Sequence, residues 1–260
     1  MDNAFEPAGH LDLASEYFRD QGLAELVVSS QASGANGYSV AIEPDIDDLV
    51  RLHQLVRERR AFTVLEFGCG FSTLVIADAL AKNADEFASS DAEVELLPAD
   101  AFRVFTVDAS EAWLETAIGR IPNGLQTHVV PTHSPVRAGT HNGQLCHFYE
   151  RLPNMVPDFI YLDGPDPQDV GGAVNGLDFS HRERTVMSGD LLLMEPSFVP
   201  GLMALIDGRT NNARFLANNF RRSYDWLEDP GGDYTMFELA EPPLGMKNRE
   251  RLAYCAGEDE

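Results

Sequence analysis

The residues best suited to chemistry lie in one short run, Glu66–Thr73, which reads EFGCGFST. Gly68 and Gly70 stand two apart after an apolar stretch, so the backbone can turn sharply and approach a ligand without a Cβ atom in the way. A helix expected to follow would point unpaired N–H groups at the same place. Dinucleotide sites use this arrangement with a third glycine, but Thr73 stands at that position. The run therefore predicts a cofactor-binding turn that departs from the dinucleotide pattern.

Two carboxylates indicate which cofactor the turn would hold. Glu66 lies two residues before the first glycine, where it would repel a pyrophosphate but attract the ammonium group of S-adenosylmethionine, a sulfonium compound without phosphate. Asp108 ends the second predicted strand, where related folds place the carboxylate that accepts hydrogen bonds from ribose hydroxyls. It follows Glu66 by 42 residues instead of about 20, and an acidic surface insertion at Asn83–Asp100 accounts for the excess. The alternatives are an ordinary strand-to-helix turn at the glycines and a helix-capping role for Asp108.

Two further aspartates end strands on the other side of the predicted crevice. Asp163 follows the strand Asp158–Leu162, and Asp207 follows Leu202–Ile206. Active sites of open α/β sheets lie at such carboxyl ends, so both side chains are placed to face a substrate as catalytic residues. Asp163 is the first candidate for the base that removes a proton from a hydroxyl acceptor. The two aspartates are also the candidate ligands for a divalent cation, whereas a plain strand-ending turn is the alternative at Asp163.

Two histidines and one arginine complete the candidates for the acceptor side. His133 and His141 lie in the segment Pro131–Leu152, which is long and turn-rich enough to be predicted as a lid. Either histidine is the next candidate base after Asp163, and His141 is also a candidate contact to the acceptor, although a histidine in a loop is commonly just solvated. Arg209 would bind an anionic group of the substrate or pair with a neighbouring carboxylate.

These residues are held by predicted strands that alternate with predicted helices. Such alternation indicates right-handed βαβ units and a mostly parallel sheet covered on both faces. A Pro-Gly-Gly turn near the C-terminus predicts an antiparallel hairpin at one edge. The predicted strands are Thr63–Phe67, Phe102–Val107, His128–Val130, Asp158–Leu162, Leu202–Ile206, Arg221–Leu227 and Tyr234–Leu239; the predicted helices are one or two within Leu11–Val28, then Ile46–Val56, Leu74–Leu80, Ser110–Ile118, Arg184–Phe198 and Thr210–Asn219, with a loop at Ser29–Ser39.

Together these features resemble the class I S-adenosylmethionine-dependent methyltransferases. The resemblance rests on E-x-G-x-G-x-S-T after a strand, an aspartate after the second strand, D-F-I-Y-L-D-G-P at the fourth, P-G before the fifth and the closing hairpin, from about residue 44 to 239. It implies a doubly wound, seven-stranded α/β fold and S-adenosylmethionine as the cofactor, with Asp108 on the ribose. In catechol-type members an Asn directly follows the second metal-binding carboxylate, but Gly208 follows Asp207 here, which favours a reaction without a metal. The turn residues implied to hold the cofactor are Glu66, Gly68, Cys69, Gly70, Ser72 and Thr73.

Composition limits the partners. The 260 residues, 44% of them hydrophobic, suit one large α/β domain at 44–260 with an N-terminal cap at 1–43. The 19 Lys and Arg against 42 Asp and Glu give a formal charge of −23, which repels phosphate backbones, so no nucleic-acid partner is expected. No stretch approaches the roughly 20 apolar residues that cross a bilayer and no secretory signal is visible, so a cytoplasmic protein without a membrane partner is expected. Three scattered cysteines argue against a disulfide framework or a zinc site, and a homo-oligomer is left open.

The sequence thus predicts an S-adenosylmethionine-dependent methyltransferase that acts on a hydroxyl of a small molecule or a glycan. Oxygen is favoured over nitrogen only by the paired strand-end aspartates. One alternative is a nicotinamide-dependent oxidoreductase, against which Glu66 and Thr73 speak. The other is a non-catalytic, methyltransferase-like scaffold, against which the intact glycine turn and Asp108 speak.

Overall fold

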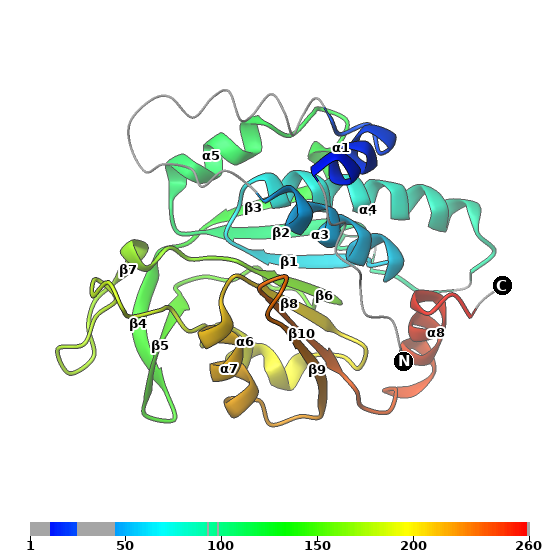
Figure 1. Cartoon of the computed structure of the whole chain (residues 1–260). Helices are drawn as coiled ribbons and strands as arrows, with labels where there is room; N and C mark the ends of the chain where they lie inside the picture. Colours follow the sequence, from blue (N-terminus) through cyan, green and yellow to red (C-terminus); the bar gives the residue numbers. More distant parts are fainter. Residues whose placement is uncertain (1–10, 25–44, 93, 98, 259–260) are drawn as a thin grey trace.

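A seven-stranded sheet with the order β3-β2-β1-β6-β8-β10-β9 forms the centre of the molecule (Figure 1). The computed structural model describes residues 11–24, 45–92, 94–97 and 99–258. The first five strands in that order run parallel, and β10 pairs antiparallel with both β8 and β9. The predicted fold class, a doubly wound and mostly parallel sheet with an antiparallel C-terminal hairpin, is therefore confirmed. The strands are β1 (Thr63–Phe67), β2 (Arg103–Asp108), β3 (Val129–His133), β6 (Phe159–Leu162), β8 (Met203–Asp207), β9 (Tyr224–Asp229) and β10 (Tyr234–Leu239).

Side chains of the central strands alternate between two cores, because successive residues of a strand point to opposite faces. On β1, Val64 packs with helices α1, α3 and α4, whereas Leu65 and Phe67 pack on the other face with α6 and α7. Figure 1 shows these two groups of helices on opposite sides of the sheet. The α-helices are α1 (Leu11–Asp20), α3 (Ile46–Glu58), α4 (Phe71–Ser89), α5 (Glu111–Gly119), α6 (Asp190–Met194), α7 (Thr210–Asn219) and α8 (Gly245–Cys255), and short 3-10 helices span Gln126–His128, Pro167–Asp169 and Glu195–Ser197.

The segment Pro131–Leu152, predicted as a turn-rich lid, is mostly a β-hairpin, and its role as a lid stays a prediction. Strands β4 (Val136–His141) and β5 (Gln144–Tyr149) pair antiparallel, and β7 (Val170–Gly171) adds a short third strand to this separate sheet. Asn142 and Gly143 connect β4 to β5 with φ angles of 49° and 77°. A two-residue Asn-Gly turn between extended runs is a strong hairpin signal, and it was present in the sequence.

Two other predicted segments also differ. The helix predicted at Arg184–Phe198 is shorter, because α6 begins only at Asp190 and residues before it are extended enough for Ser188 to bridge β5. The surface insertion predicted at Asn83–Asp100 is helical in its first part, since α4 continues to Ser89. Asn83 itself is buried, and its Nδ2 donates to two backbone carbonyls. The loop predicted at Ser29–Ser39 lies outside the described residues.

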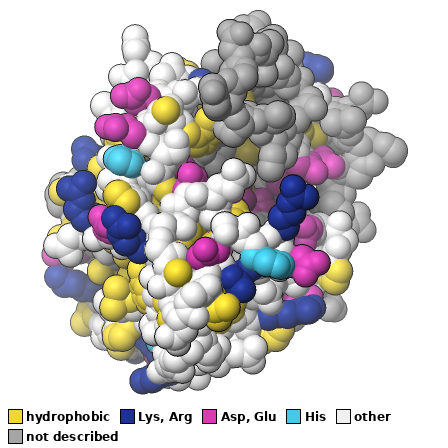
Figure 2. All heavy atoms as spheres, turned by 90° about the vertical axis from the view of Figure 1, so that its left-hand side faces the viewer, with side chains coloured by type: hydrophobic (Ala, Val, Ile, Leu, Met, Phe, Trp, Pro, Cys, Tyr) yellow, Lys and Arg dark blue, Asp and Glu magenta, His cyan; other side chains and the backbone are white. Residues whose placement is uncertain are grey.

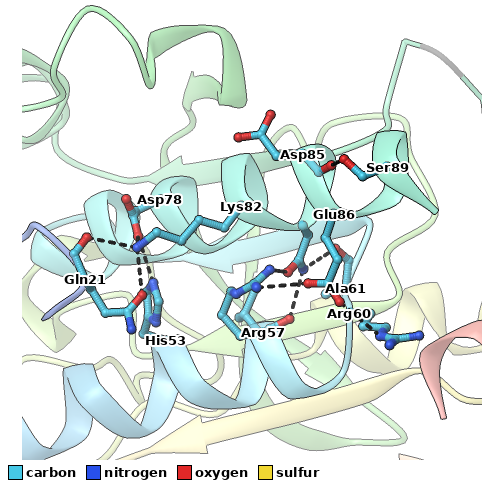
Figure 3. A network of polar contacts seen from close by, with 12 residues as sticks. Gln21, His53, Arg57, Arg60, Ala61, Asp78, Lys82, Asp85, Glu86 and Ser89 are labelled. Atoms are coloured by element: carbon cyan, nitrogen blue, oxygen red, sulfur yellow. Dashed lines mark hydrogen bonds and ion pairs between the residues drawn. The ribbon is translucent and has the colours of Figure 1, made fainter. Parts of the chain in front are cut away.

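A chain of polar contacts attaches α1 and the residue Gln21 after it to α3 and α4; Figure 3 shows the part of it from Gln21 to His53. The Tyr17 hydroxyl lies 2.6 Å from Nδ1 of the buried His53, whose Nε2 lies 2.9 Å from an Asp78 carboxylate oxygen. Lys82 donates to Asp78 and to Gln21. Burial lowers the pKa of His53, so the imidazole is neutral at physiological pH. None of the described helices combines the length and apolar character needed to span a membrane.

Helix α8, which the sequence did not predict, covers the amino-terminal edge of the sheet (Figure 1). Arg251 lies 2.7 Å from the Asp158 carboxylate, and this carboxylate also accepts the backbone N–H groups of Phe62 and Thr63 at 2.9 and 2.8 Å. The Tyr254 ring stacks on Phe62 at 5.2 Å. The candidate site lies at the opposite edge of the sheet, where the parallel strands end.

Candidate functional site

The turn between β1 and α4 needs glycine at its first position. Gly68 has a φ of 87°, and a Cβ there would lie 2.9 Å from the backbone nitrogen of Gly164, in the turn after β6. The two strand ends therefore touch backbone to backbone. At Gly70 a Cβ would meet nothing within 4 Å, so the space in front of the α4 N-terminus is open to a ligand.

Glu66 organises this turn from beneath. It is fully buried, and its Oε2 accepts a hydrogen bond of 2.7 Å from the Thr73 hydroxyl, whose oxygen accepts the Gly70 N–H at 3.1 Å. Burial raises the pKa of Glu66 to about 7, although the hydroxyls of Ser72 and Thr73 favour the charged form. The structure places these turn residues together, and Glu66 acts on the open space through Thr73 and the backbone.

Asp108 and Trp113 hold the turn from the β2 side. Asp108 accepts the Cys69 N–H at 2.9 Å with one carboxylate oxygen and the Ser110 N–H at 2.7 Å with the other. The Trp113 indole N–H donates to the Cys69 carbonyl at 2.6 Å. Ser110 is the N-cap of α5, because its hydroxyl accepts the Trp113 N–H, so the helix-capping role considered for Asp108 belongs to Ser110. A carboxylate has about four lone-pair sites, and the two N–H groups and the Cys69 thiol use three of those of Asp108, which leaves one for a ribose hydroxyl.

Asp163 and Arg209 face each other across the turns that follow β6 and β8. Arg209 Nε lies 3.5 Å from Asp163 Oδ1, and the guanidinium also donates to the backbone carbonyls of Asp163 and Pro165. Arg209 is thus engaged with a neighbouring carboxylate. The Asp163 side chain is 57% exposed, yet crowding by surrounding protein raises its pKa while Arg209 lowers it. Asp163 is therefore an accessible carboxylate whose pKa is raised above its usual value.

Asp207 is engaged in a buried network instead. Its carboxylate accepts the Tyr161 hydroxyl at 2.7 Å and lies 3.0 Å from Arg51, which also pairs with Asp48. The Arg51 guanidinium lies 4.2 Å from the centroid of the Tyr234 ring. Burial raises the pKa of Asp207, and the contacts to Tyr161 and Arg51 oppose this. Both oxygens of Asp207 thus have partners within the protein, unlike the exposed Asp163.

The two candidate histidines lie apart from Asp163. His133 ends β3 opposite Asp108, and its Nε2 lies 3.2 Å from the Ala109 carbonyl oxygen. Three strand spacings separate β3 from β6, which puts His133 on the order of 14 Å from the strand that Asp163 follows. His141 ends β4 at the tip of the hairpin. In the ranges described, no three His, Cys, Asp or Glu side chains are grouped so that they could hold a metal ion.

Arg51, Tyr161 and Trp113 contribute to the site but were not found from the sequence. Arg51 follows an ordinary helical pattern, and its contact to Asp207 spans 156 residues, so no local signal marks it. Figure 2 looks onto the edge where β1 runs into α4 and β2 into α5. Acidic, basic and histidine side chains lie among apolar ones on the described part of this face, without a large area of one charge.

No protein-family model and no curated protein matches the chain. Solved structures do. The O-methyltransferase TomG from Streptomyces achromogenes, involved in tomaymycin synthesis and solved with SAM, is 15% identical over 89% of each chain, with a TM-score of 0.44. An O-methyltransferase from Bacillus cereus, solved with SAH, is 17% identical over 88% of this chain and 97% of the other, with a TM-score of 0.44. The SAH-bound methyltransferase PaMTH1 of Podospora anserina is 13% identical over 88% of this chain and 95% of the other, with a TM-score of 0.48.

Proposed function

We propose that the chain is an S-adenosylmethionine-dependent methyltransferase that acts on a hydroxyl of a small molecule or a glycan. The observation that carries the proposal is the open space at Gly70, in front of the α4 N-terminus and beside Asp108. It lies at the carboxyl ends of β1 and β2, where open α/β sheets bind nucleotides. The cofactor supplies a methyl group already activated by a sulfonium.

The residues of the turn fit that cofactor. Gly68 and Gly70 let the backbone come close to a ligand, and the first N–H groups of α4 are donors for the carboxylate of the methionine part. Asp108 has one lone-pair site left for a ribose hydroxyl. Glu66 maintains the turn through Thr73, and an ammonium group bound above it would favour its ionised form.

Thr73 also favours this reading over a nicotinamide cofactor. Its hydroxyl links Glu66 to the Gly70 N–H, a contact that the third glycine of a dinucleotide site could not make. The buried carboxyl of Glu66 beneath the turn would disfavour a pyrophosphate. Thr73 and Glu66 therefore act together as a turn built for a ligand without phosphates.

Asp163 is the proposed base. An acceptor hydroxyl must lose its proton as the methyl group is transferred, and a base works best when its pKa lies near the operating pH. Burial raises the pKa of both Asp163 and Asp207, but only Asp163 is exposed, whereas Tyr161 and Arg51 engage both oxygens of Asp207. Its ion pair with Arg209 holds the carboxylate in place, and positioning supplies much of the remaining acceleration.

Isothermal titration with S-adenosylmethionine and with NAD(H) tests the cofactor. Gly70→Arg fills space that is empty in the fold, so it should abolish S-adenosylmethionine binding without lowering the melting temperature. Gly124→Arg is the matched control, since a Cβ there also meets nothing within 4 Å, and it should bind normally. Selective NAD(H) binding, or normal S-adenosylmethionine binding by Gly70→Arg, refutes the cofactor assignment.

Asp163→Asn tests the base. The variant should lower the rate of methyl transfer at least about a hundredfold and leave the affinity for S-adenosylmethionine within about twofold, because the contacts to the Asp163 backbone carbonyl remain. Asp166→Asn, at a nearby exposed aspartate that caps a 3-10 helix, is the control. An unchanged rate removes Asp163 from the mechanism.

A further inference from the structure

Four buried polar side chains near Arg209 have hydrogen-bonding atoms that are not used inside the protein. The buried atoms of these four residues that have no hydrogen-bond partner in the described part of the chain are both ring nitrogens of His147, the Tyr149 hydroxyl, the Ser188 hydroxyl and the Asn212 Nδ2. His147, Ser188 and Asn212 have no exposed surface, and Tyr149 is 6% exposed. Buried polar groups in folded proteins are normally paired, so this polar cluster (His147, Tyr149, Ser188 and Asn212) calls for an explanation.

The backbone brings the four side chains to one place. His147 and Tyr149 are alternate residues of β5 and share a face, with ring centroids 6.3 Å apart. Ser188 bridges His147 in parallel, through backbone hydrogen bonds of 2.9 Å from His147 to Met187 and from Gly189 to His147. The Ser188 N–H in turn donates to Asn212 Oδ1 at 2.9 Å. This bond fixes the Asn212 amide at the start of α7, while its NH₂ group has no partner in the described structure.

The cluster adjoins the crevice between the cofactor turn and Arg209. Asp108 raises the pKa of the Tyr149 phenol and Arg209 lowers it, after the larger effect of burial, so both charges are near the ring. The Phe67 ring, at the end of β1, lies 5.6 Å from that of Tyr149. Arg209 also acts on His147, whose pKa is lowered to about 3, chiefly by burial. Tyr149 therefore lies between the proposed cofactor site and Arg209, and His147 lies behind it.

The chemistry of the cluster selects an uncharged ligand. All four groups are neutral near pH 7, and together they offer both donors and acceptors, which matches a hydroxyl group. The charges nearest to Tyr149 are mostly negative (Asp108 and Asp190), and Arg209 is already bound to Asp163. An anionic group would thus lose its hydration without gaining a free cation.

We propose that the polar cluster binds the uncharged, hydroxyl-bearing part of the methyl acceptor, with Tyr149 at the entrance and His147, Ser188 and Asn212 behind it. The proposal rests on the proposed function, since it assigns the acceptor to the same crevice. Because three of the groups have no exposed surface, the acceptor must displace the segment 172–187. That segment is joined to β5 by the ring of the buried Phe179, 6.3 Å from that of His147, and by the Met187 carbonyl, which accepts the His147 N–H at 2.9 Å.

The test uses the full chain with ¹⁵N-labelled histidine, saturated with S-adenosylhomocysteine, and follows the ring nitrogens by NMR. His147→Gln assigns the signal of His147. The probes are phenol and methyl glucoside, which are uncharged, and benzoate and glucose 6-phosphate as their anionic counterparts. The uncharged probes should shift the His147 signal, and the anions should not.

Tyr149→Phe and Tyr224→Phe form the matched pair of variants, since both hydroxyls are buried without a partner in the described structure. Tyr149→Phe should weaken binding of the uncharged probes about tenfold, as expected for one lost hydrogen bond that leaves a partner unsatisfied. It should leave the melting temperature and the affinity for S-adenosylhomocysteine unchanged. Tyr224→Phe, on β9, should change none of the three.

The outcomes separate the two proposals. If no probe shifts His147, if an anion does, or if Tyr149→Phe binds the probes as the wild type does, the cluster holds internal water and the inference is refuted. If the uncharged probes bind but S-adenosylhomocysteine does not, the proposed function fails and the cluster stands as a binding site for alcohols.

Discussion

Replacing Glu66 by glutamine tests whether burial sets the protonation of this carboxyl group. Glutamine has nearly the same shape, and its oxygen can accept the Thr73 hydroxyl as Glu66 does. The pKa of Glu66 is about 7 in the fold against a usual 4.5. The folded state therefore holds the proton more tightly than the unfolded chain, so stability falls as the pH rises from about 4.5 to about 7 and stays low above that.

The magnitude follows from the two pKa values. At about 1.36 kcal/mol for each pKa unit, the ionised Glu66 costs the fold about 3 kcal/mol above pH 8, and less than about 1 kcal/mol at pH 5. Glutamine does not ionise, so Glu66→Gln should match the wild type within about 1 kcal/mol at pH 5 and exceed its stability by about 3 kcal/mol at pH 8.5. Other buried acids such as Asp190 titrate equally in both proteins and cancel in the difference.

Urea unfolding followed by circular dichroism at both pH values measures this difference. Glu195→Gln is the control, because the buried Glu195 accepts the N–H groups of Arg221 and Arg222 with one oxygen and should gain no stability at pH 8.5. If the free energies of unfolding of the wild type and Glu66→Gln differ by the same amount at both pH values, the reasoning is refuted, because ionisation of Glu66 then does not destabilise the fold.

Three further predictions concern the elements around the site. Arg51→Met should lower the free energy of unfolding by about 3–5 kcal/mol, because it leaves Asp207 buried without its cation; a loss below about 1 kcal/mol in urea unfolding would show that water screens this network. Gly68→Ala should cost more stability than Gly22→Ala, since both have positive φ but only Gly68 is crowded, by Gly164; equal melting temperatures would contradict the close contact of the strand ends. The stability contributed by the neutral His53 should be lost as the pH falls through and below 6.5, because the unfolded chain protonates His53 more readily than the fold does; thermal unfolding of His53→Gln should lack this contribution between pH 7.5 and 5.5.

The strands and their ends could be predicted because their signals are local. The apolar run before Gly68, the aspartates that end β2, β6 and β8, and the Pro-Gly-Gly turn before β10 each sit within a few residues of the element they mark. Parallel order then brings the strand ends to one edge without further information. The cofactor side of the site depends on such ends, which is why the sequence could propose it residue by residue.

The acceptor side could not be predicted in the same way, because it depends on contacts between distant segments. Asp207 and Asp163 look alike in the sequence. In the fold, however, Arg51 and Tyr161 contact the carboxylate of Asp207, whereas the carboxylate of Asp163 is exposed. Tyr149 lies on β5, for which the Asn142-Gly143 turn is the local signal in the sequence. Only the pairing of β5 with the residues before α6 brings His147 beside Ser188.

The contact of α8 with the start of β1 has a consequence for how the chain is made. Asp158 binds the first N–H groups of β1 and is itself held by Arg251, and Phe62 is covered by Tyr254. A nascent chain whose last helix is still inside the ribosome has the strands of the sheet but lacks this cover. Because β10 also lies between β8 and β9, the sheet cannot be finished in the order of synthesis. The sheet is therefore completed only once β10 has been made, and Phe62 gains the Tyr254 ring only after α8 has formed.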